Sequence, residues 1–310
     1  MTKTSRTPAS FSITLPATSA NLGPAFDAAA LAFSLFLTVR GKPASQFSVT
    51  ARGRDAEICG QMRDHLIVAT YRDVLDAEGQ PVQPLALHIK NEIPVGKGCG
   101  SSAAARLAGI ALANHFGRLD WTENRIVGEA ARREHHPDNA AACWMGGLVV
   151  ARLAQSGEAQ VARVTPKGKW PLLLAVPEKS LSTEEARRVL PAQYSRADAV
   201  TNIQNSMLLL AAFAQGRRDL LSAALEDRIH QPYRAPLCPL LPCLQQLTGS
   251  SGILGLALSG AGPSVLIFLD PKVSSSATRT RVRGHLRAHG LATELLSTKI
   301  TSRGVSQSRS

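Results

Sequence analysis

The residues that point most directly to chemistry lie in IPVGKGCGSSAAA, residues 93–105. Gly96, Gly98 and Gly100 stand at alternate positions, and glycine lets backbone N–H groups approach a ligand that side chains would hold away. A Ser-Ser pair then opens an Ala-rich stretch typical of a helix, whose N-terminus favours an anion. This segment, called the glycine loop below, therefore predicts a phosphate-binding site.

The glycine loop fits neither of two common nucleotide motifs. It contains no G-x-x-x-x-G-K-[ST] pattern and lacks the spacing of G-x-G-x-x-G. Asp120 lies about 20 residues further on, as a ribose-binding carboxylate does in dinucleotide-binding folds. It stands at an expected helix start, however, rather than at the end of a second strand. When the motif is considered alone, the alternative to a phosphate-binding site is a glycine turn that precedes a core helix and binds no ligand.

Two further segments combine glycine or proline with polar side chains: PATSANLGPAFD, residues 16–27, and LSGAGPSV, residues 258–265. In the first, Asn21 and Asp27 offer the acceptors that a buried ammonium group requires. A turn-forming Asn and a helix N-cap are the structural alternatives. In the second, Gly260 lets the backbone come close to a substrate or nucleotide.

In this order, the three segments resemble the motifs of the GHMP kinases, which include galactokinase, homoserine kinase, mevalonate kinase and phosphomevalonate kinase. The resemblance spans residues 16–268 and is strongest to the homoserine kinases. It implies an α+β fold of two domains, an N-terminal nucleotide-binding domain like ribosomal protein S5 and a C-terminal ferredoxin-like α/β domain. It also implies ATP-dependent phosphorylation of L-homoserine to O-phospho-L-homoserine, in threonine biosynthesis, by a homodimer.

The resemblance assigns roles at the substrate end. Asn21 and Asp27 would contact the amino and hydroxyl end of homoserine. His136 matches the family's H-x-D-N stretch, which places Asp138 and Asn139 beside the reacting hydroxyl. Asp138 is the candidate general base, although phosphoryl transfer depends mostly on positioning and charge stabilisation and does not require a strong base.

Three more residues belong to this predicted site. Thr183 and Arg187, four residues apart, match a family segment that faces the substrate, and QPYRAP adds Arg234 on a proline-stiffened loop. Two arginines that converge on one small molecule suit a carboxylate, because a guanidinium can bind it bidentately. Taken singly, each arginine is more typical of a solvated surface.

The predicted ATP-binding segment comprises Pro94, Val95, Gly96, Lys97, Gly98, Cys99, Gly100, Ser101 and Ser102. Lys97 is the candidate for neutralising phosphate charge. Ser102 and Glu129 are the candidate Mg²⁺ ligands, because Mg²⁺ takes few protein oxygens beside phosphate and water.

Several positions depart from the family pattern. Ala25 and Ala30 replace common glycines, Cys99 replaces a leucine, and His65 replaces an asparagine that helps to define the adenine pocket. An alanine is tolerated in helical backbone and strained where φ must be positive. The spacing from Glu129 to His136 is also about one residue short. These departures leave open a related kinase acting on another small hydroxylated acid or amino acid.

Strands and helices must position these segments. Strand-like patterns cover residues 11–16, 85–93, 147–153, 171–176, 253–258 and 264–269, and helical patterns cover 101–116, 120–133, 182–190 and 198–214. We place one domain at residues 1–167, a second at 168–302 and a basic polar tail at 303–310. The predicted N-caps are Asp120 and Ser182, each followed three residues later by Glu.

The composition excludes other classes. The chain has 310 residues and a net charge of +12, and its last forty residues alone carry eight Lys or Arg against one Glu. Few aromatic residues are available to stack bases, so nucleic-acid binding is disfavoured. A third hypothesis, after a homoserine kinase and a related kinase for another acceptor, is a relative that is non-catalytic or that binds nucleic acid. Five cysteines without a C-x-x-C pair indicate reduced thiols in a cytoplasmic protein, and neither a signal peptide nor a membrane span is expected.

Overall fold

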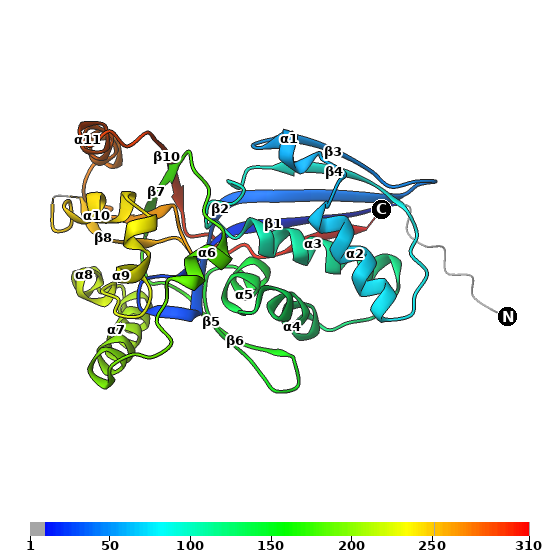
Figure 1. The fold of residues 1–310 in the computed structure, drawn as a ribbon, viewed down its shortest axis with the longest axis horizontal. Helices are drawn as coiled ribbons and strands as arrows, with labels where there is room; N and C mark the ends of the chain where they lie inside the picture. Colours follow the sequence, from blue (N-terminus) through cyan, green and yellow to red (C-terminus); the bar gives the residue numbers. More distant parts are fainter. Residues whose placement is uncertain (1–9, 251, 310) are drawn as a thin grey trace.

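Two β-sheets organise the chain, and the structure, a computed structural model, describes residues 10–250 and 252–309 (Figure 1). The strands of the first sheet are β1 (Phe11–Asn21), β2 (Ala25–Pro43), β3 (Ser48–Gly53), β4 (Leu85–Asn91), β5 (Leu148–Leu153), β6 (Ala159–Val164) and β11 (Ser306–Arg309). Their order is β11-β1-β2-β4-β3, and the β5–β6 hairpin extends from β2. The β3–β4 pair is parallel, and the other pairs are antiparallel.

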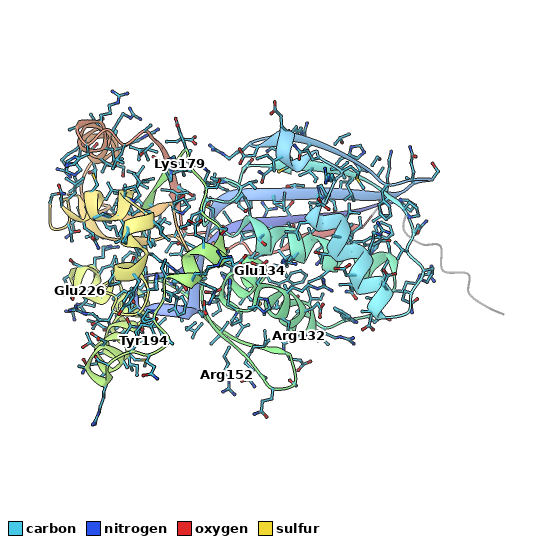
Figure 2. All side chains as sticks on the ribbon, viewed as in Figure 1. Arg132, Glu134, Arg152, Lys179, Tyr194 and Glu226 are labelled. Carbon is cyan, nitrogen blue, oxygen red and sulfur yellow. The ribbon has the colours of Figure 1, made fainter. Side chains whose placement is uncertain are left out.

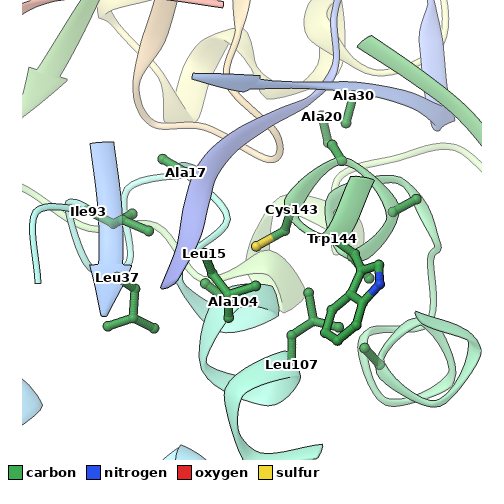
Figure 3. Packing of buried hydrophobic residues seen from close by; sticks show 14 of the residues in the cluster. Leu15, Ala17, Ala20, Ala30, Leu37, Ile93, Ala104, Leu107, Cys143 and Trp144 are labelled. Atoms are coloured by element: carbon green, nitrogen blue, oxygen red, sulfur yellow. The ribbon is translucent and has the colours of Figure 1, made fainter. Parts of the chain in front are cut away.

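Helices cover one face of this sheet (Figure 1). They are α2 (Leu66–Ala77), α3 (Ser101–Phe116), α4 (Glu123–Glu134) and α5 (Asp138–Met145), while the short α1 (Ala56–Cys59) follows β3. At the start of β1, every second residue is buried against them, as the period of a strand requires. Figure 3 shows Leu15 of β1 beside Ala104, with Leu107 and Trp144 in the same core. The small side chains of α3 allow this close packing.

The second sheet contains β7 (Pro171–Pro177), β8 (Ile253–Leu258), β9 (Val265–Leu269) and β10 (Thr293–Lys299). Its order is β10-β7-β9-β8, with antiparallel pairing throughout. Its helical segments are α6 (Thr183–Arg188), α7 (Arg196–Gln215), η1 (Arg218–Leu220), α8 (Leu221–Ala224), α9 (Gln231–Arg234), η2 (Ala235–Leu237), α10 (Leu240–Gln245) and α11 (Ser275–Ala288). The strand-like patterns predicted at residues 253–258 and 264–269 are confirmed as β8 and β9.

Three helices begin at residues for which the sequence predicts chemistry. α3 begins at Ser101, directly after the glycine loop, and α5 begins at Asp138. α6 begins at Thr183, and the predicted cap is confirmed because Ser182 Oγ accepts a hydrogen bond from the Glu185 N–H at 3.1 Å. Helix starts therefore direct three sets of candidate residues toward one region of the molecule.

Two predictions differ from the structure. α4 is capped by Thr122, whose Oγ1 accepts from the Arg125 N–H at 3.3 Å, whereas Asp120 lies before the cap with φ of 52°. The segment at residues 303–310, predicted as a separate polar tail, contributes β11, which pairs with the start of β1. An edge strand of this kind is held by backbone hydrogen bonds, so its side chains need no apolar pattern.

The prediction of an α+β fold is confirmed by the two sheets and their helices. The predicted boundary at residues 167 and 168 falls in the connection from β6 to β7, where the chain leaves the first sheet. Within the described residues, every helix is too short or too polar to cross a lipid bilayer.

Candidate active site

The glycine loop has a backbone conformation that favours glycine at three positions. Gly96, Gly98 and Gly100 have φ of 67°, 74° and 71°. A Cβ atom at Gly98 would clash with the carbonyl oxygen of Ser259 and would lie 2.6 Å from that of Gly262. The loop is therefore pressed against the turn between β8 and β9, which leaves no room for a side chain there.

The glycine loop forms one side of a pocket to which several distant segments contribute. The pocket is lined by Ala20, Asn21, Asp27, Gly96, Gly98, Cys99, Gly100, Ser101, Ser102, Glu134, His136, Asp138, Asn139, Leu181, Thr183, Arg187, Arg234, Gly260, Ala261 and Gly262. All of the residues predicted for the substrate end are in this lining. Asn21 is fixed there because its Nδ2 donates to the Gly260 carbonyl at 2.8 Å and its Oδ1 accepts from the Asp27 N–H at 2.9 Å.

Asp138 presents one engaged and one unengaged carboxylate oxygen. Oδ1 accepts from the Asn139 N–H and lies 2.6 Å from His136 Nδ1. Oδ2 is buried and makes no hydrogen bond with any residue that the structure describes. The Asn139 side chain accepts from Thr18 Oγ1 at 2.7 Å. Because buried polar atoms are normally hydrogen-bonded, Oδ2 is the atom of this pocket most suited to receive a proton from a ligand.

The charge of His136 depends on its carboxylate neighbours. Burial disfavours the imidazolium form, but the hydrogen bond and charge of Asp138, together with the charges of Asp27 and Glu134, outweigh it. The pKa of His136 is therefore raised above its ordinary value. A proton on His136 Nδ1 is donated to Asp138 Oδ1 whether the ring is charged or neutral, and Oδ2 is left as the accepting atom.

Two arginines and one aspartate meet beside the ring of Phe26. Arg187 binds both carboxylate oxygens of Asp27, at 3.0 and 2.7 Å. The Cζ atoms of Arg187 and Arg234 lie 5.4 and 5.3 Å from the Phe26 ring centroid. Burial, and next the charge of Arg187, lower the pKa of Arg234 to about 10, so Arg234 stays cationic at neutral pH. Two cations facing one carboxylate favour a further anionic group in this part of the pocket.

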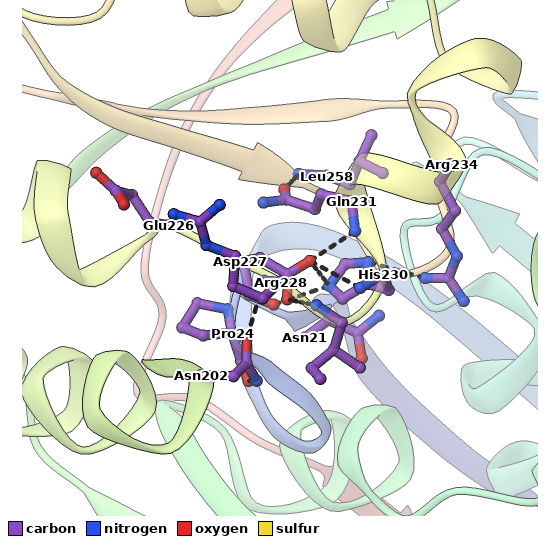
Figure 4. A network of polar contacts seen from close by, with 12 residues as sticks. Asn21, Pro24, Asn202, Glu226, Asp227, Arg228, His230, Gln231, Arg234 and Leu258 are labelled. Atoms are coloured by element: carbon purple, nitrogen blue, oxygen red, sulfur yellow. Dashed lines mark hydrogen bonds and ion pairs between the residues drawn. The ribbon is translucent and has the colours of Figure 1, made fainter. Parts of the chain in front are cut away.

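A buried network that the sequence did not reveal holds Arg234 (Figure 4). His230 Nε2 lies 2.8 Å from the Gly23 carbonyl oxygen, and its Nδ1 lies 3.1 Å from Arg234 Nη1. Because a guanidinium only donates, Nδ1 is the accepting nitrogen and Nε2 carries the proton. Burial lowers the pKa of His230 to about 4, which keeps the ring neutral. Asp227 accepts from the backbone N–H groups of residues 229–231 and so fixes this turn.

Glu134, rather than Glu129, is the carboxylate that the structure brings to Ser102. Ser102 Oγ donates to Glu134 Oε1 at 2.6 Å, and Glu134 lines the pocket. Glu129 does not line the pocket, and its carboxylate is bound by Arg132 and, at 2.7 Å, by Arg133. Glu134 Oε1 is itself bound by Arg106, so position in the pocket lining, rather than pairing with arginine, separates the two carboxylates. Figure 2 shows Glu134 near the centre of the molecule and Arg132 nearer the outer surface. The expected pairing of Ser102 with Glu129 is therefore corrected to Ser102 with Glu134.

Three residues of the predicted ATP-binding segment stand outside the pocket lining. Pro94 and Lys97 do not contribute to it, and Lys97 Nζ instead donates to the backbone carbonyl of Glu178. Val95 lines a neighbouring cavity, and its N–H donates to Asp55 Oδ2 at 2.9 Å. The expected role of Lys97 in neutralising phosphate is thus not supported by its position.

The neighbouring cavity is mostly apolar and shares Gly96, Ser101 and Ser102 with the pocket. His65 lines it, with Nε2 at 3.1 Å from the Cys59 carbonyl oxygen. His65 Nδ1 is buried and has no hydrogen-bond partner in the described part of the chain. Burial lowers the pKa of His65, so a neutral ring faces this cavity.

The alanines that replace family glycines cause no backbone strain. Neither Ala25 nor Ala30 is among the described residues with positive φ, whereas Gly23, Asn21 and Asp27 are, at 77°, 70° and 53°. The cysteines behave as predicted, because all five are free thiols. Burial raises the pKa of Cys99 to about 12, so its thiol in the pocket wall is neutral.

Two family models match this chain. The GHMP kinases N terminal domain matches residues 65–147, and the GHMP kinases C terminal model matches residues 209–288. The chain is 44% identical over 301 residues to a homoserine kinase of Solibacter usitatus, which covers 96% of this chain and 97% of that protein. It is 36% identical over 294 residues to a homoserine kinase of Deinococcus radiodurans, with 95% of each chain covered.

Solved structures show the same fold. A homoserine kinase from Cytophaga hutchinsonii superposes with a TM-score of 0.79 at 22% identity, over 97% of this chain and 98% of that one. A mevalonate kinase from L. major superposes with a TM-score of 0.70 at 16% identity, over 94% and 96% of the two chains. Together these likenesses confirm the predicted two-domain fold.

Proposed function

The chain belongs to the GHMP kinases and, within them, to the homoserine kinases, and on this premise we propose that it phosphorylates L-homoserine with ATP. The product is O-phospho-L-homoserine, in a step of threonine biosynthesis. The proposal rests on one observation: a single pocket contains both the glycine loop and a group of charged side chains. The glycine loop lies at one end, and Asp27, Arg187 and Arg234 lie at the other.

The phosphate end binds ATP mainly through backbone groups. The positive φ values of the three loop glycines and the start of α3 at Ser101 support this role, because successive backbone N–H groups and a helix N-terminus attract phosphate. The apolar cavity beside the loop is our candidate for the adenine ring. His65 Nδ1 lacks a described partner there and is suited to a polar atom of the base.

The oxygen donors of Ser102, at the start of α3, and Glu134, at the end of α4, fit Mg²⁺. Ser102 Oγ and Glu134 Oε1 lie 2.6 Å apart beside the loop, and Mg²⁺ prefers carboxylate and hydroxyl oxygens together with phosphate. We therefore assign Ser102 and Glu134, in place of Glu129, as the residues that would hold the ion. When bound, Mg²⁺ would neutralise negative charge on the phosphates.

The amino-acid end recognises a zwitterion. In this structure Asp27 and Arg187 neutralise each other. The ammonium of homoserine suits Asp27, with Asn21 holding that residue in place, and the carboxylate suits Arg187 and Arg234. Binding of homoserine would thus replace one ion pair within the protein by two ion pairs between the protein and the substrate. Thr183 and Gly260 complete the wall at this end.

The hydroxyl of homoserine then lies toward Asp138 and Asn139. We propose that Asp138 Oδ2 accepts the hydroxyl proton, since Oδ1 is already engaged by His136 and by a backbone N–H. The hydroxyl oxygen attacks the γ-phosphorus, and the bond to the β–γ bridging oxygen breaks to release ADP. Most of the rate enhancement comes from holding the reacting groups in line.

His230 acts as a positioning residue for this step. Its neutral ring accepts from Arg234 and donates to the Gly23 carbonyl, so it links the second arginine to the loop that carries Asp27. A homodimer and a cytoplasmic location stay predictions of the family resemblance and the cysteine content.

The test is ADP release by the purified protein with Mg-ATP and, separately, L-homoserine, L-threonine, L-serine and mevalonate. We expect homoserine to give the highest kcat/KM. A higher value with another acceptor would favour a kinase for a different small hydroxylated acid. Folded protein that releases no ADP with any acceptor, and that binds nucleic acid with a steep salt dependence, would favour the non-catalytic alternative.

A further inference from the structure

A cysteine and two histidines converge on the second sheet's helices, away from the pocket. Cys243 lies in α10, His285 lies in the last turn of α11, and His289 follows one turn later. Each offers one ligand atom, and the three ligand atoms all lie within 4.8 Å of one another. None of the three residues lines the active-site pocket. Cys243 is buried, His285 is half-buried and His289 is exposed, so the cluster reaches from the core to the surface.

Both imidazole rings are oriented by a backbone carbonyl. One nitrogen of His285, Nε2, lies 2.9 Å from the Cys243 carbonyl oxygen. One nitrogen of His289, Nδ1, lies 2.9 Å from the His285 carbonyl oxygen. Metal-bound histidines almost always make such a second hydrogen bond, which fixes the tautomer and the direction of the ring. The ring centroids lie 4.4 Å apart with a tilt of 48°, so the two rings are in contact with each other and hold their nitrogen atoms near Cys243.

We propose that Cys243, His285 and His289 bind a thiophilic divalent cation, with Zn²⁺ as the preferred ion. A thiolate with two imidazoles is a donor set that Zn²⁺ favours and that Mg²⁺ and Ca²⁺ do not. Bonds of about 2.3 Å to sulfur and about 2.0 Å to nitrogen require the donor atoms to move together by small side-chain rotations. Because His289 is exposed, its side chain has room to make that adjustment, and water would supply the fourth ligand.

The consequence of binding is a link between two helices. α10 and α11 are separated in sequence by β8 and β9, and the ion would join them on the outside of the second sheet. Because the unfolded chain does not hold the three ligands together, the ion stabilises the folded state of this part of the molecule. The site is independent of the proposed reaction.

The test uses the full-length protein and Co²⁺ as a spectroscopic substitute for Zn²⁺. We expect one Co²⁺ per chain with a thiolate-to-metal charge-transfer band, and we expect Zn²⁺ to displace it. The cluster of Asp27, His136 and Asp138 in the pocket also holds its ligand atoms within 4.8 Å, but it contains no sulfur, so the band distinguishes the two sites.

Two variants and one control make the test decisive. His289→Gln should weaken Co²⁺ binding at least about tenfold, and because His289 is exposed, the fold and the kinase activity should be unchanged. Cys243→Ser should remove the charge-transfer band. The control His88→Gln, in β4 of the other sheet, should leave binding unchanged. Absence of the band in the parent protein, or equal Co²⁺ affinity in His289→Gln and the parent, would overturn the proposal.

Discussion

The two ends of the pocket are built in different ways. The phosphate end is the backbone of one continuous segment, held by glycines with positive φ. The amino-acid end is made mainly of side chains from segments as far apart as Asn21 and Arg234, and Asn21, Arg187 and Arg234 are each held by hydrogen bonds to another segment. A site made of backbone is sensitive to added atoms, whereas a site made of charged side chains is sensitive to lost ones. The two ends should therefore respond to different kinds of substitution.

The largest effect is expected from Gly98→Ala at the phosphate end. The new methyl group would collide with the carbonyl oxygens of Ser259 and Gly262, and the loop would have to shift. Because misplacement of about 1 Å can cost about a hundredfold in rate, we expect kcat/KM to fall by about that factor or more. Gly79→Ala is the matched control, since Gly79 also has positive φ, at 63°, with open space around it. Equal losses in kcat/KM for the two variants would show that strain, rather than the clash, is responsible.

Arg234→Ala should affect only the amino-acid end. Loss of one partner from a buried charged contact costs about 2 kcal/mol or more, so the KM for homoserine should rise about thirtyfold or more. The KM for ATP should stay nearly constant. Arg188→Ala is the control, because Arg188 is exposed and pairs with Glu184. An equal rise in both KM values for Arg234→Ala would contradict the separation of the two ends.

A smaller effect distinguishes two carboxylates of α4. Glu134→Gln should raise the Mg²⁺ concentration for half-maximal activity about tenfold, because it removes a proposed ligand. Glu129→Gln should leave this concentration unchanged, since Glu129 pairs with arginines outside the pocket. Activity titrations with Mg²⁺ at saturating ATP measure both. If Glu129→Gln raised this Mg²⁺ concentration and Glu134→Gln did not, Glu129 would be the metal ligand, as the sequence suggested.

The smallest effect at neutral pH concerns His230. Its folded-state pKa of about 4 lies below the unfolded value of about 6.5, so the unfolded chain binds the proton more readily. The stability contributed by this ring is therefore complete above about pH 6.5 and is lost as the pH falls through about 4. Denaturant unfolding at several pH values should show a flatter profile for His230→Asn. Parallel profiles for the variant and the parent would mean that the ring is not buried neutral.

Local sequence signals located the start of α3, whereas the substrate end was located through the family resemblance, and all of its predicted residues line the pocket. Glycine spacing and the Ser-Ser helix start are local signals, and α3 begins where they indicate. Glu134 was missed because Glu129 and Glu134 are five residues apart, about 140° around one helix, and only tertiary packing decides which faces Ser102. His230 stands in a loop without periodicity. The strand β11 was missed because it is polar and is recognised only through its partner β1.

The most direct test of the account compares L-homoserine with 3-aminopropan-1-ol, which keeps the hydroxyl and the amine and lacks the carboxylate. The ratio of their kcat/KM values should be large for the parent enzyme, because Arg187 and Arg234 bind the carboxylate. In Arg234→Ala this ratio should fall about thirtyfold or more, through loss of activity with homoserine alone. An unchanged ratio, with both acceptors slowed equally, would contradict the claim that this end of the pocket recognises an amino-acid carboxylate.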